Sequence, residues 1–142
     1  MNINEVIIEA EYVDILLTLI NPPYEISSIT KLVIMSFCIK HETNTSVYNN
    51  RVRDFIDEFF DNISLKLSAN YNEFTHIVRV IDMLNSSSKV IVDGDYIEPN
   101  HRQIFKPENT FLKYCSTKSP NPIMEINKLD AKALLEEVIR YV

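Results

Sequence analysis

Val90-Ile91-Val92-Asp93-Gly94-Asp95-Tyr96-Ile97 contains the only glycine among the 142 residues of this chain. An Asp-Gly pair between two short β-branched runs is a strong local signal for a tight hairpin. We therefore predict a β-ribbon over Lys89–Pro99, closed by a type I′ turn in which Gly94 takes a positive φ. P-loops, dinucleotide fingerprints and nucleophile elbows each need two or more glycines, so the single glycine excludes these three kinds of site.

The chain begins with an amphipathic helix. Its predicted span is Ile3–Ile20, and the prolines of Asn21-Pro22-Pro23-Tyr24 end it. Apolar residues at helical spacing define the face that we expect to be buried: Ile8, Tyr12, Ile15, Leu16 and Leu19. The acids Glu5, Glu9 and Asp14 are expected on the opposite side.

A second helix should run from a cap at Ser27 or Ser28 to about His41. It is apolar on most of its sides: Ile29, Leu32, Val33, Ile34, Met35, Phe37, Cys38 and Ile39. Such a helix is normally either central in its domain or packed against a partner, and the sequence leaves both explanations open. Cys38 is expected to be a buried, unreactive thiol, since the chain has no C-x-x-C motif.

Two more helices are expected before the ribbon. The third should run from Val47 or Val52 to Leu67, where Ser68-Ala69-Asn70 interrupts it, and the fourth over Asn72–Asn85. The apolar stripe of the fourth helix is predicted from its periodicity: Phe74, Ile77, Val78 and Ile81. The same pattern places three polar residues toward solvent: Glu73, Arg79 and Asp82.

Helix, helix and two-stranded ribbon is the local order of a winged-helix unit. We expect a mainly α fold with one small β-hairpin, organised as a winged-helix-like single domain plus a C-terminal helix. The helical core would span residues 1–98, an irregular basic loop 99–126, and the C-terminal helix 127–142. Asn127 and Asp130 resemble a capping box at the start of that last helix. Its apolar stripe would consist of Ala131, Leu134, Leu135, Val138, Ile139 and Val142.

Charge is unevenly distributed along the chain. The net charge is −6, and residues 1–30 hold five acids but no Lys or Arg. DNA-binding proteins usually show a basic face, so this balance argues against non-specific nucleic-acid binding as the main task. A small basic patch stays open, and the candidate contacts to a partner or to nucleic acid are Arg79, Lys89, Arg102, Lys106, Lys113 and Lys118. The aromatic residues between the last four could stack on bases or could anchor the loop on its own domain.

Residues suited to catalysis or metal binding form no recognisable motif. His41, His76 and His101 lie far apart in sequence and in no metal-ligand spacing. Asp93 and Asp95 flank Gly94, and turn formation already explains them. We expect no enzymatic activity, no cofactor and no metal. The acidic N-terminal segment and the absence of an 18-residue apolar run predict a cytoplasmic protein without a membrane span.

Four features together resemble a known family: the Glu-rich first helix, the Asn21-Pro22-Pro23-Tyr24 turn, the Ile26–Lys40 helix and the Leu84–Pro99 junction. The chain resembles the small middle components of bacterial three-component ABC ATPase systems, which include Lamassu-type anti-phage operons. The resemblance implies a non-enzymatic adaptor that binds near the head of an SMC-like ABC ATPase and links it to an effector, often a nuclease. DNA would then be contacted only within the complex.

Two other functions stay open. A winged-helix DNA-binding regulator would use Arg79, Lys89 and Arg102 on phosphates. Acids around the same helix and ribbon would repel DNA: Asp82, Asp93, Asp95 and Glu98. A toxin–antitoxin or immunity partner, in which a small acidic protein masks a basic enzyme, is the third possibility.

Overall fold

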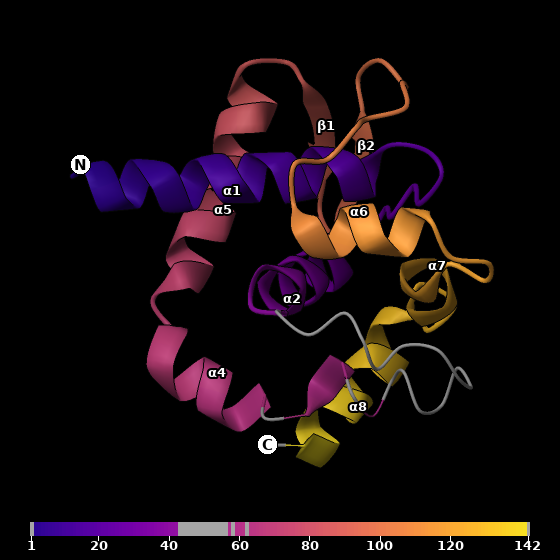
Figure 1. The fold of residues 1–142 in the computed structure, drawn as a ribbon. Coiled ribbons are helices and arrows are strands. Elements are labelled where there is room, and N and C mark those ends of the chain that lie inside the picture. Colours follow the sequence, from indigo (N-terminus) through magenta and orange to yellow (C-terminus); the bar gives the residue numbers. More distant parts are fainter. Residues whose placement is uncertain (1, 43–56, 58, 62, 142) are drawn as a thin grey trace.

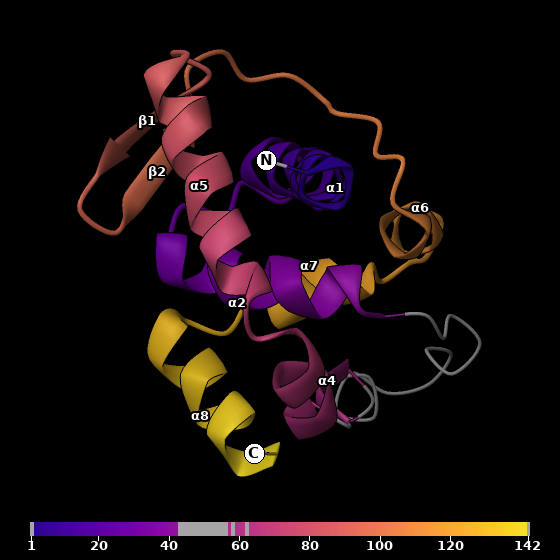
Figure 2. The ribbon, with the colours of Figure 1, turned by 90° about the vertical axis from the view of Figure 1, so that its left-hand side faces the viewer.

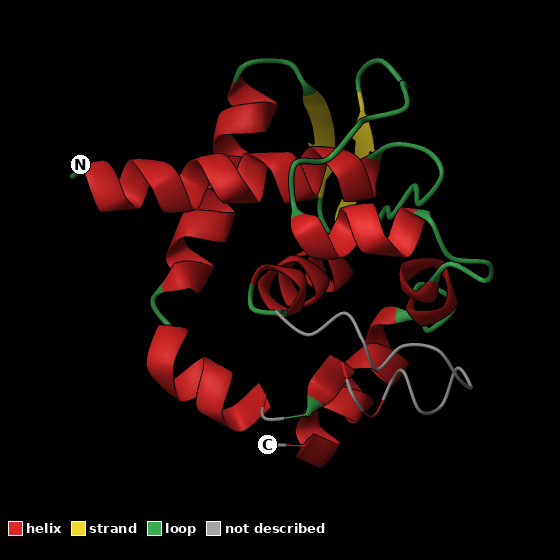
Figure 3. Cartoon of the chain, in the orientation of Figure 1, coloured by secondary structure: helices red, strands yellow, loops and turns green. Residues whose placement is uncertain are grey.

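The computed structural model describes residues 2–42, 57, 59–61 and 63–141. The helices are α1 (Ile3–Ile20), α2 (Ile29–Lys40), α4 (Ile63–Asn70), α5 (Glu73–Ser86), α6 (Thr110–Ser116), α7 (Pro122–Ile126) and α8 (Ala131–Tyr141). The strands are β1 (Val90–Asp93) and β2 (Tyr96–Pro99), which form one antiparallel hairpin (Figure 3). Buried side chains from all of these elements belong to one hydrophobic core. The predicted mainly α fold with one small hairpin is confirmed.

Three helices and the hairpin form the winged-helix-like part. Figure 1 shows α1 crossing α5, with α2 packed against both, and the hairpin following α5. The linker between α1 and α2 joins the ribbon through a single antiparallel bridge, Ser28 to Tyr96. This order of helix, bridging residue, helix, helix and hairpin is the winged-helix order. Here residues 41–72, including α4, separate α2 from α5.

Helix α1 has the predicted bounds and the predicted apolar face. Asn2 caps it by accepting the backbone N–H of Glu5 at 2.9 Å, and the Glu5 carboxylate accepts the N–H of Asn2. Tyr12, Ile15, Leu16 and Leu19 are fully buried. Glu9, however, is buried as well, so its predicted exposed position is wrong.

Helix α2 begins after Ser28, whose hydroxyl accepts the N–H of Lys31, as predicted. It lies in the middle of the molecule and contacts α1, α5, α6 and α8 (Figure 2). A central position therefore explains why α2 is apolar on most sides. Cys38 is buried as expected, and burial raises the pKa of its thiol to about 12.

The hairpin pairs Val90 with Pro99 and Asp93 with Tyr96. Of the two turn residues, Gly94 and Asp95, only Gly94 has a positive φ, of 61°. A type I′ turn needs two positive φ values, whereas a II′ turn needs one, at its first position. The predicted type I′ turn is therefore wrong, and the geometry has II′ character. Asp95 is instead held by α2, since its carboxylate accepts from Ser28 Oγ at 2.6 Å and from Thr30 N at 2.9 Å.

The segment predicted to be an irregular loop, 99–126, contains two helices. Asn109 caps α6 by accepting the N–H of Leu112, and Asn121 caps α7, which begins at Pro122. Asparagine before a helix and proline at its first position are recognised start signals, so local capping explains the error. Only residues 100–109, called the strap below, run without helix or strand between the hairpin and α6.

Other boundaries differ from the prediction as well. Helix α4 continues through Ser68-Ala69-Asn70, and the predicted start of the third helix, at Val47 or Val52, lies outside the described residues. Helix α8 begins at Ala131, because Asp130 alone caps it by accepting the N–H of Ala133 at 2.8 Å. Asn127 ends α7 and forms no capping box with Asp130.

Two helices bury only part of the predicted face: Ile77 and Ile81 of α5 and Leu134 of α8 are buried as predicted. On α5, Glu73 is buried and Val78 is half exposed, because the helix packs through residues nearer to Glu73: His76, Ile77, Val80, Ile81 and Leu84. On α8, Leu134 is buried, whereas Leu135 and Ile139 are exposed. Among the described helices none is both long and apolar enough to span a bilayer.

Candidate interaction surface

The six predicted basic contacts are distributed over several elements. Arg79 lies on α5 and Lys89 just before β1, while Arg102 and Lys106 lie on the strap. The last two follow at α6 and beyond it, Lys113 and Lys118. Lys106 and Lys113 line the same hollow, and Lys89 lines a different groove. The fold therefore brings one pair of these cations together at one hollow.

Four of the six cations interact with neighbouring side chains. The ion pairs are Arg79 Nη1 to Glu9 Oε2 at 3.1 Å, Arg102 Nη1 to Glu25 Oε1 at 3.4 Å, and Lys113 Nζ to Glu108 Oε2 at 3.6 Å. Lys118 Nζ lies 5.0 Å from the centroid of the Tyr114 ring. These carboxylates offset much of the positive charge that a phosphate would encounter.

Acids outnumber bases on the part of the molecule that a winged helix would turn toward DNA. The outer face of α5 and the hairpin carry two bases, Arg79 and Lys89, and four acids: Asp82, Asp93, Asp95 and Glu98. Three of the four acids are exposed, and Glu98 is partly exposed. Hydrogen bonds from Ser28 and Thr30 lower the pKa of Asp95, so this carboxylate stays ionised. Coulomb repulsion therefore disfavours a duplex at this surface.

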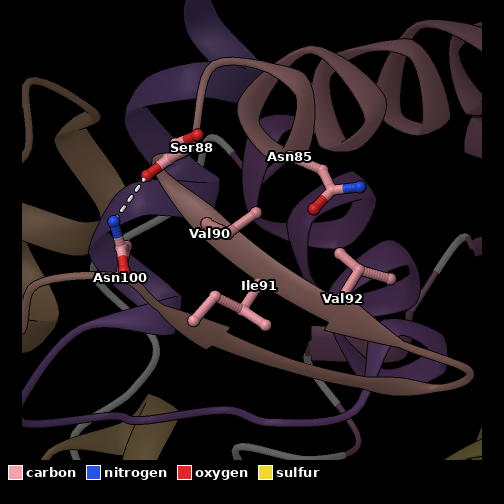
Figure 4. Close-up of a pocket in the computed structure, with 6 residues that line it drawn as sticks. All are labelled: Asn85, Ser88, Val90, Ile91, Val92 and Asn100. Carbon is pink, nitrogen blue, oxygen red and sulfur yellow. Dashed lines mark hydrogen bonds between the residues drawn. The ribbon is translucent and has the colours of Figure 1, made fainter.

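A small hollow lies between α5 and the hairpin (Figure 4). It has a volume of about 280 Å³, and six uncharged residues line it: Asn85, Ser88, Val90, Ile91, Val92 and Asn100. The amide of Asn100 donates to the backbone carbonyl of Ser88 at 3.0 Å, which joins the two ends of the hairpin. A hollow lined by amides and apolar side chains offers no cation to a phosphate.

The strap crosses α1 between two larger concave regions. One, of about 770 Å³, lies between α1, the end of α5 and the strap, and the other, of about 400 Å³, lies on the α6 side. Phe105 lines both, and it is partly buried. The strap is also held where Gln103 N–H donates to Asn21 Oδ1 at 3.1 Å. These contacts support the loop-anchoring role for its aromatic residue.

Two buried carboxylates, which sequence reasoning placed in solvent, fasten the three core helices. The Glu73 carboxylate accepts from Tyr12 Oη at 2.6 Å and contacts His41 Nε2 at 3.0 Å and Lys40 Nζ at 3.3 Å. Burial by itself raises the pKa of Glu73, but the hydrogen bonds from Tyr12 and His41 outweigh it, and the net effect lowers the pKa. Such a saturated carboxylate is a poor proton acceptor, so the cluster serves structure rather than acid–base chemistry.

The second buried carboxylate, Glu9, joins α1 to α5. Its Oε2 lies 2.7 Å from His76 Nδ1 and 3.1 Å from Arg79 Nη1. Sequence reasoning missed both clusters, because their partners are separated by 32 to 70 residues. The one available signal is that Glu9, His76 and Glu73 border the apolar stripes of their helices.

The N-terminal half of α1 projects beyond the core (Figure 1). Its outer face carries three large apolar side chains at helical spacing, Ile3, Val6 and Ile7, which are 74%, 52% and 51% exposed. Together with the exposed Ala10 they form the α1 stripe. A hollow of about 480 Å³ adjoins it, lined by Ile7, Ala10, Glu11, Asp14, Lys40, Glu108, Asn109 and Thr110.

Comparison with protein-family models, with curated proteins and with solved structures finds no match to this chain. Within the part of the chain that the structure describes, no three His, Cys, Asp or Glu side chains are grouped as a metal site requires. The function of this chain therefore has to be inferred from its own surfaces.

Proposed function

We propose that this protein is a non-enzymatic adaptor that links an SMC-like ABC ATPase to an effector subunit in a cytoplasmic anti-phage defence complex. The α1 stripe carries this proposal. Three large apolar side chains, each at least half exposed, follow one another at helical spacing on the part of α1 that projects from the core (Figure 1). Contiguous exposed apolar surface of this kind marks protein contact sites.

The charge distribution supports a protein partner over DNA. Helix α1 contains four acids and no Lys or Arg. The outer surface of α5 and the hairpin also carries more acids than bases. The winged-helix order of the elements favours the alternative, a DNA-binding regulator, but its recognition surface has the wrong sign of charge.

The class of partner comes from the sequence resemblance to middle components of ABC ATPase systems. A subunit that acts by binding other proteins needs a stable core and an uncovered surface. Both are present, since the buried carboxylates Glu9 and Glu73 tie α1 to α5 while the first turns of α1 stay uncovered. An effector could then be held on a second surface of the same small domain.

The proposal predicts that a coiled-coil ABC ATPase is encoded beside this gene, and co-expression of that ATPase with this chain tests it. We expect the two chains to elute together in size-exclusion chromatography with light scattering, and the ATPase activity to reside in the large chain. If the two chains elute separately and the small chain alone binds DNA with nanomolar affinity and sequence selectivity, the adaptor hypothesis is wrong and the DNA-binding regulator is favoured. Separate elution without DNA binding would also reject the adaptor.

A further inference from the structure

We propose that the α1 stripe and the acidic hollow beside it bind an amphipathic helix of a partner whose flanks carry Lys or Arg. This inference rests on the proposed adaptor function and names the chemistry of the segment that the adaptor would hold.

One face of α1 is covered by the chain itself along only part of its length. Asp14 accepts the backbone N–H of Glu108 at 2.9 Å and that of Asn109 at 2.9 Å. The segment that leads into α6 therefore covers this face of α1 at Asp14. Ala10 and Ile7 lie on the same face, one and two turns earlier, and within the described part of the chain an open hollow adjoins them there instead of a covering element. A partner segment placed in the hollow would continue the covering that α6 begins.

The charges around this uncovered face are mostly acidic. The side chains of Glu11 and Glu108 are 50% and 89% exposed. Among the described residues that line the hollow, Lys40 is the one cation, and it is only 13% exposed and bound to Glu11 and Glu73. A second copy of this chain would place acids against acids, and a nucleic acid would be repelled. A basic partner segment is therefore the occupant that the charges favour.

The apolar positions fit a helix better than an extended strand. Ile3, Val6, Ile7 and Ala10 repeat at i, i+3, i+4 and i+7, which extends over about 10 Å of helix axis. Two helices pack by placing such stripes against one another, and charges beside the stripe choose the partner. A partner helix with Leu or Ile at the same spacing and Lys or Arg beside them would satisfy both conditions.

The test uses a labelled synthetic peptide of about 20 residues, with Leu at i, i+3, i+4 and i+7 and Lys beside the stripe. A matched peptide carries Glu at each Lys position. We expect the full chain to bind the Lys peptide at least about tenfold more tightly than the Glu peptide, measured by fluorescence anisotropy, with affinity falling between about 50 mM and 500 mM salt.

Matched variants locate the site. Val6→Asp should weaken binding of the Lys peptide at least about tenfold. Val78→Asp is the control, because Val78 is 51% exposed on α5, against 52% for Val6 on α1. It should leave binding unchanged, and circular dichroism should show both variants folded.

Three results would overturn the inference: equal binding of the two peptides, equal loss in both variants, or a dimer of the chain that Val6→Asp dissolves. The ATPase co-elution assay separates this inference from the proposed function. If the ATPase co-elutes with the Val6→Asp variant as well as with the wild type, the surface is wrong and the adaptor stands. If it does not co-elute with the wild type, the adaptor itself fails.

Discussion

Replacing Glu73 by alanine removes the carboxylate on which Tyr12, His41 and Lys40 converge. The largest consequence concerns Tyr12, whose side chain is completely buried. Its hydroxyl would keep no acceptor, and a buried unsatisfied donor costs about 1–3 kcal/mol. Breaking the buried charge pair with Lys40 adds to this, so we expect a total loss of about 3–5 kcal/mol.

Two further variants divide that loss into parts. Tyr12→Phe should cost only about 0.5–1.5 kcal/mol, because the Glu73 carboxylate keeps His41 and Lys40. Glu11→Ala is the matched control, since Glu11 also pairs with Lys40 at 3.3 Å but is half exposed. It should cost about 0–1 kcal/mol.

Urea unfolding followed by far-ultraviolet circular dichroism measures these losses, since the chain has no tryptophan. The double variant of Tyr12→Phe and Glu73→Ala should show a coupling energy of about 1 kcal/mol or more, because both changes act on one hydrogen bond. Equal losses for Glu73→Ala and Glu11→Ala, or additive effects in the double variant, would refute the role given to the buried carboxylate.

Gly94→Val should lower stability by about 1–2 kcal/mol, because Gly94 has a φ of 61°, at which a β-branched residue is strained. No atom lies within 4 Å of the added Cβ, so a steric clash does not contribute. A melting curve checks this, and Gly94→Asn should lose less. Burial lowers the pKa of His41, although the carboxylate of Glu73 acts in the opposite direction. As the pH drops through about 6.5, the unfolded chain takes up a proton at His41 that the folded chain does not, so stability should fall. Urea midpoints should depend less on pH in His41→Asn, and equal slopes would contradict this. Duplex DNA should bind no more tightly than about 10⁻⁴–10⁻⁶ M in a gel shift at about 150 mM salt.

Local rules predicted much of the winged-helix-like part. The spans of α1, α2 and α5 follow from apolar periodicity, from the cap at Ser28 and from the prolines after Asn21. These signals act between residues a few positions apart, so one sequence contains them. The same rules could have found α6 and α7, whose Asn caps stand directly before them.

The candidate surface followed less well from the sequence. Its six cations were chosen by residue type, and four of them engage a carboxylate or an aromatic ring in the folded chain. In the sequence, the residues of the α1 stripe look like part of an ordinary amphipathic helix. Only the positions of α5 and α6 show that its first turns extend past the elements that cover the rest.

The sequence by itself determined the mainly helical class, the hairpin at Gly94 and the acidic character of α1, since each depends on composition or on neighbours along the chain. Tertiary structure decided that Glu9 on α1 and Glu73 on α5 are buried, and that α5 packs through the side that carries Glu73. A carboxylate leaves water only where donors replace its hydration. Here those donors are His76 and Arg79 for Glu9, and Tyr12, His41 and Lys40 for Glu73. They lie 32 to 70 residues away, so only packing brings them into reach.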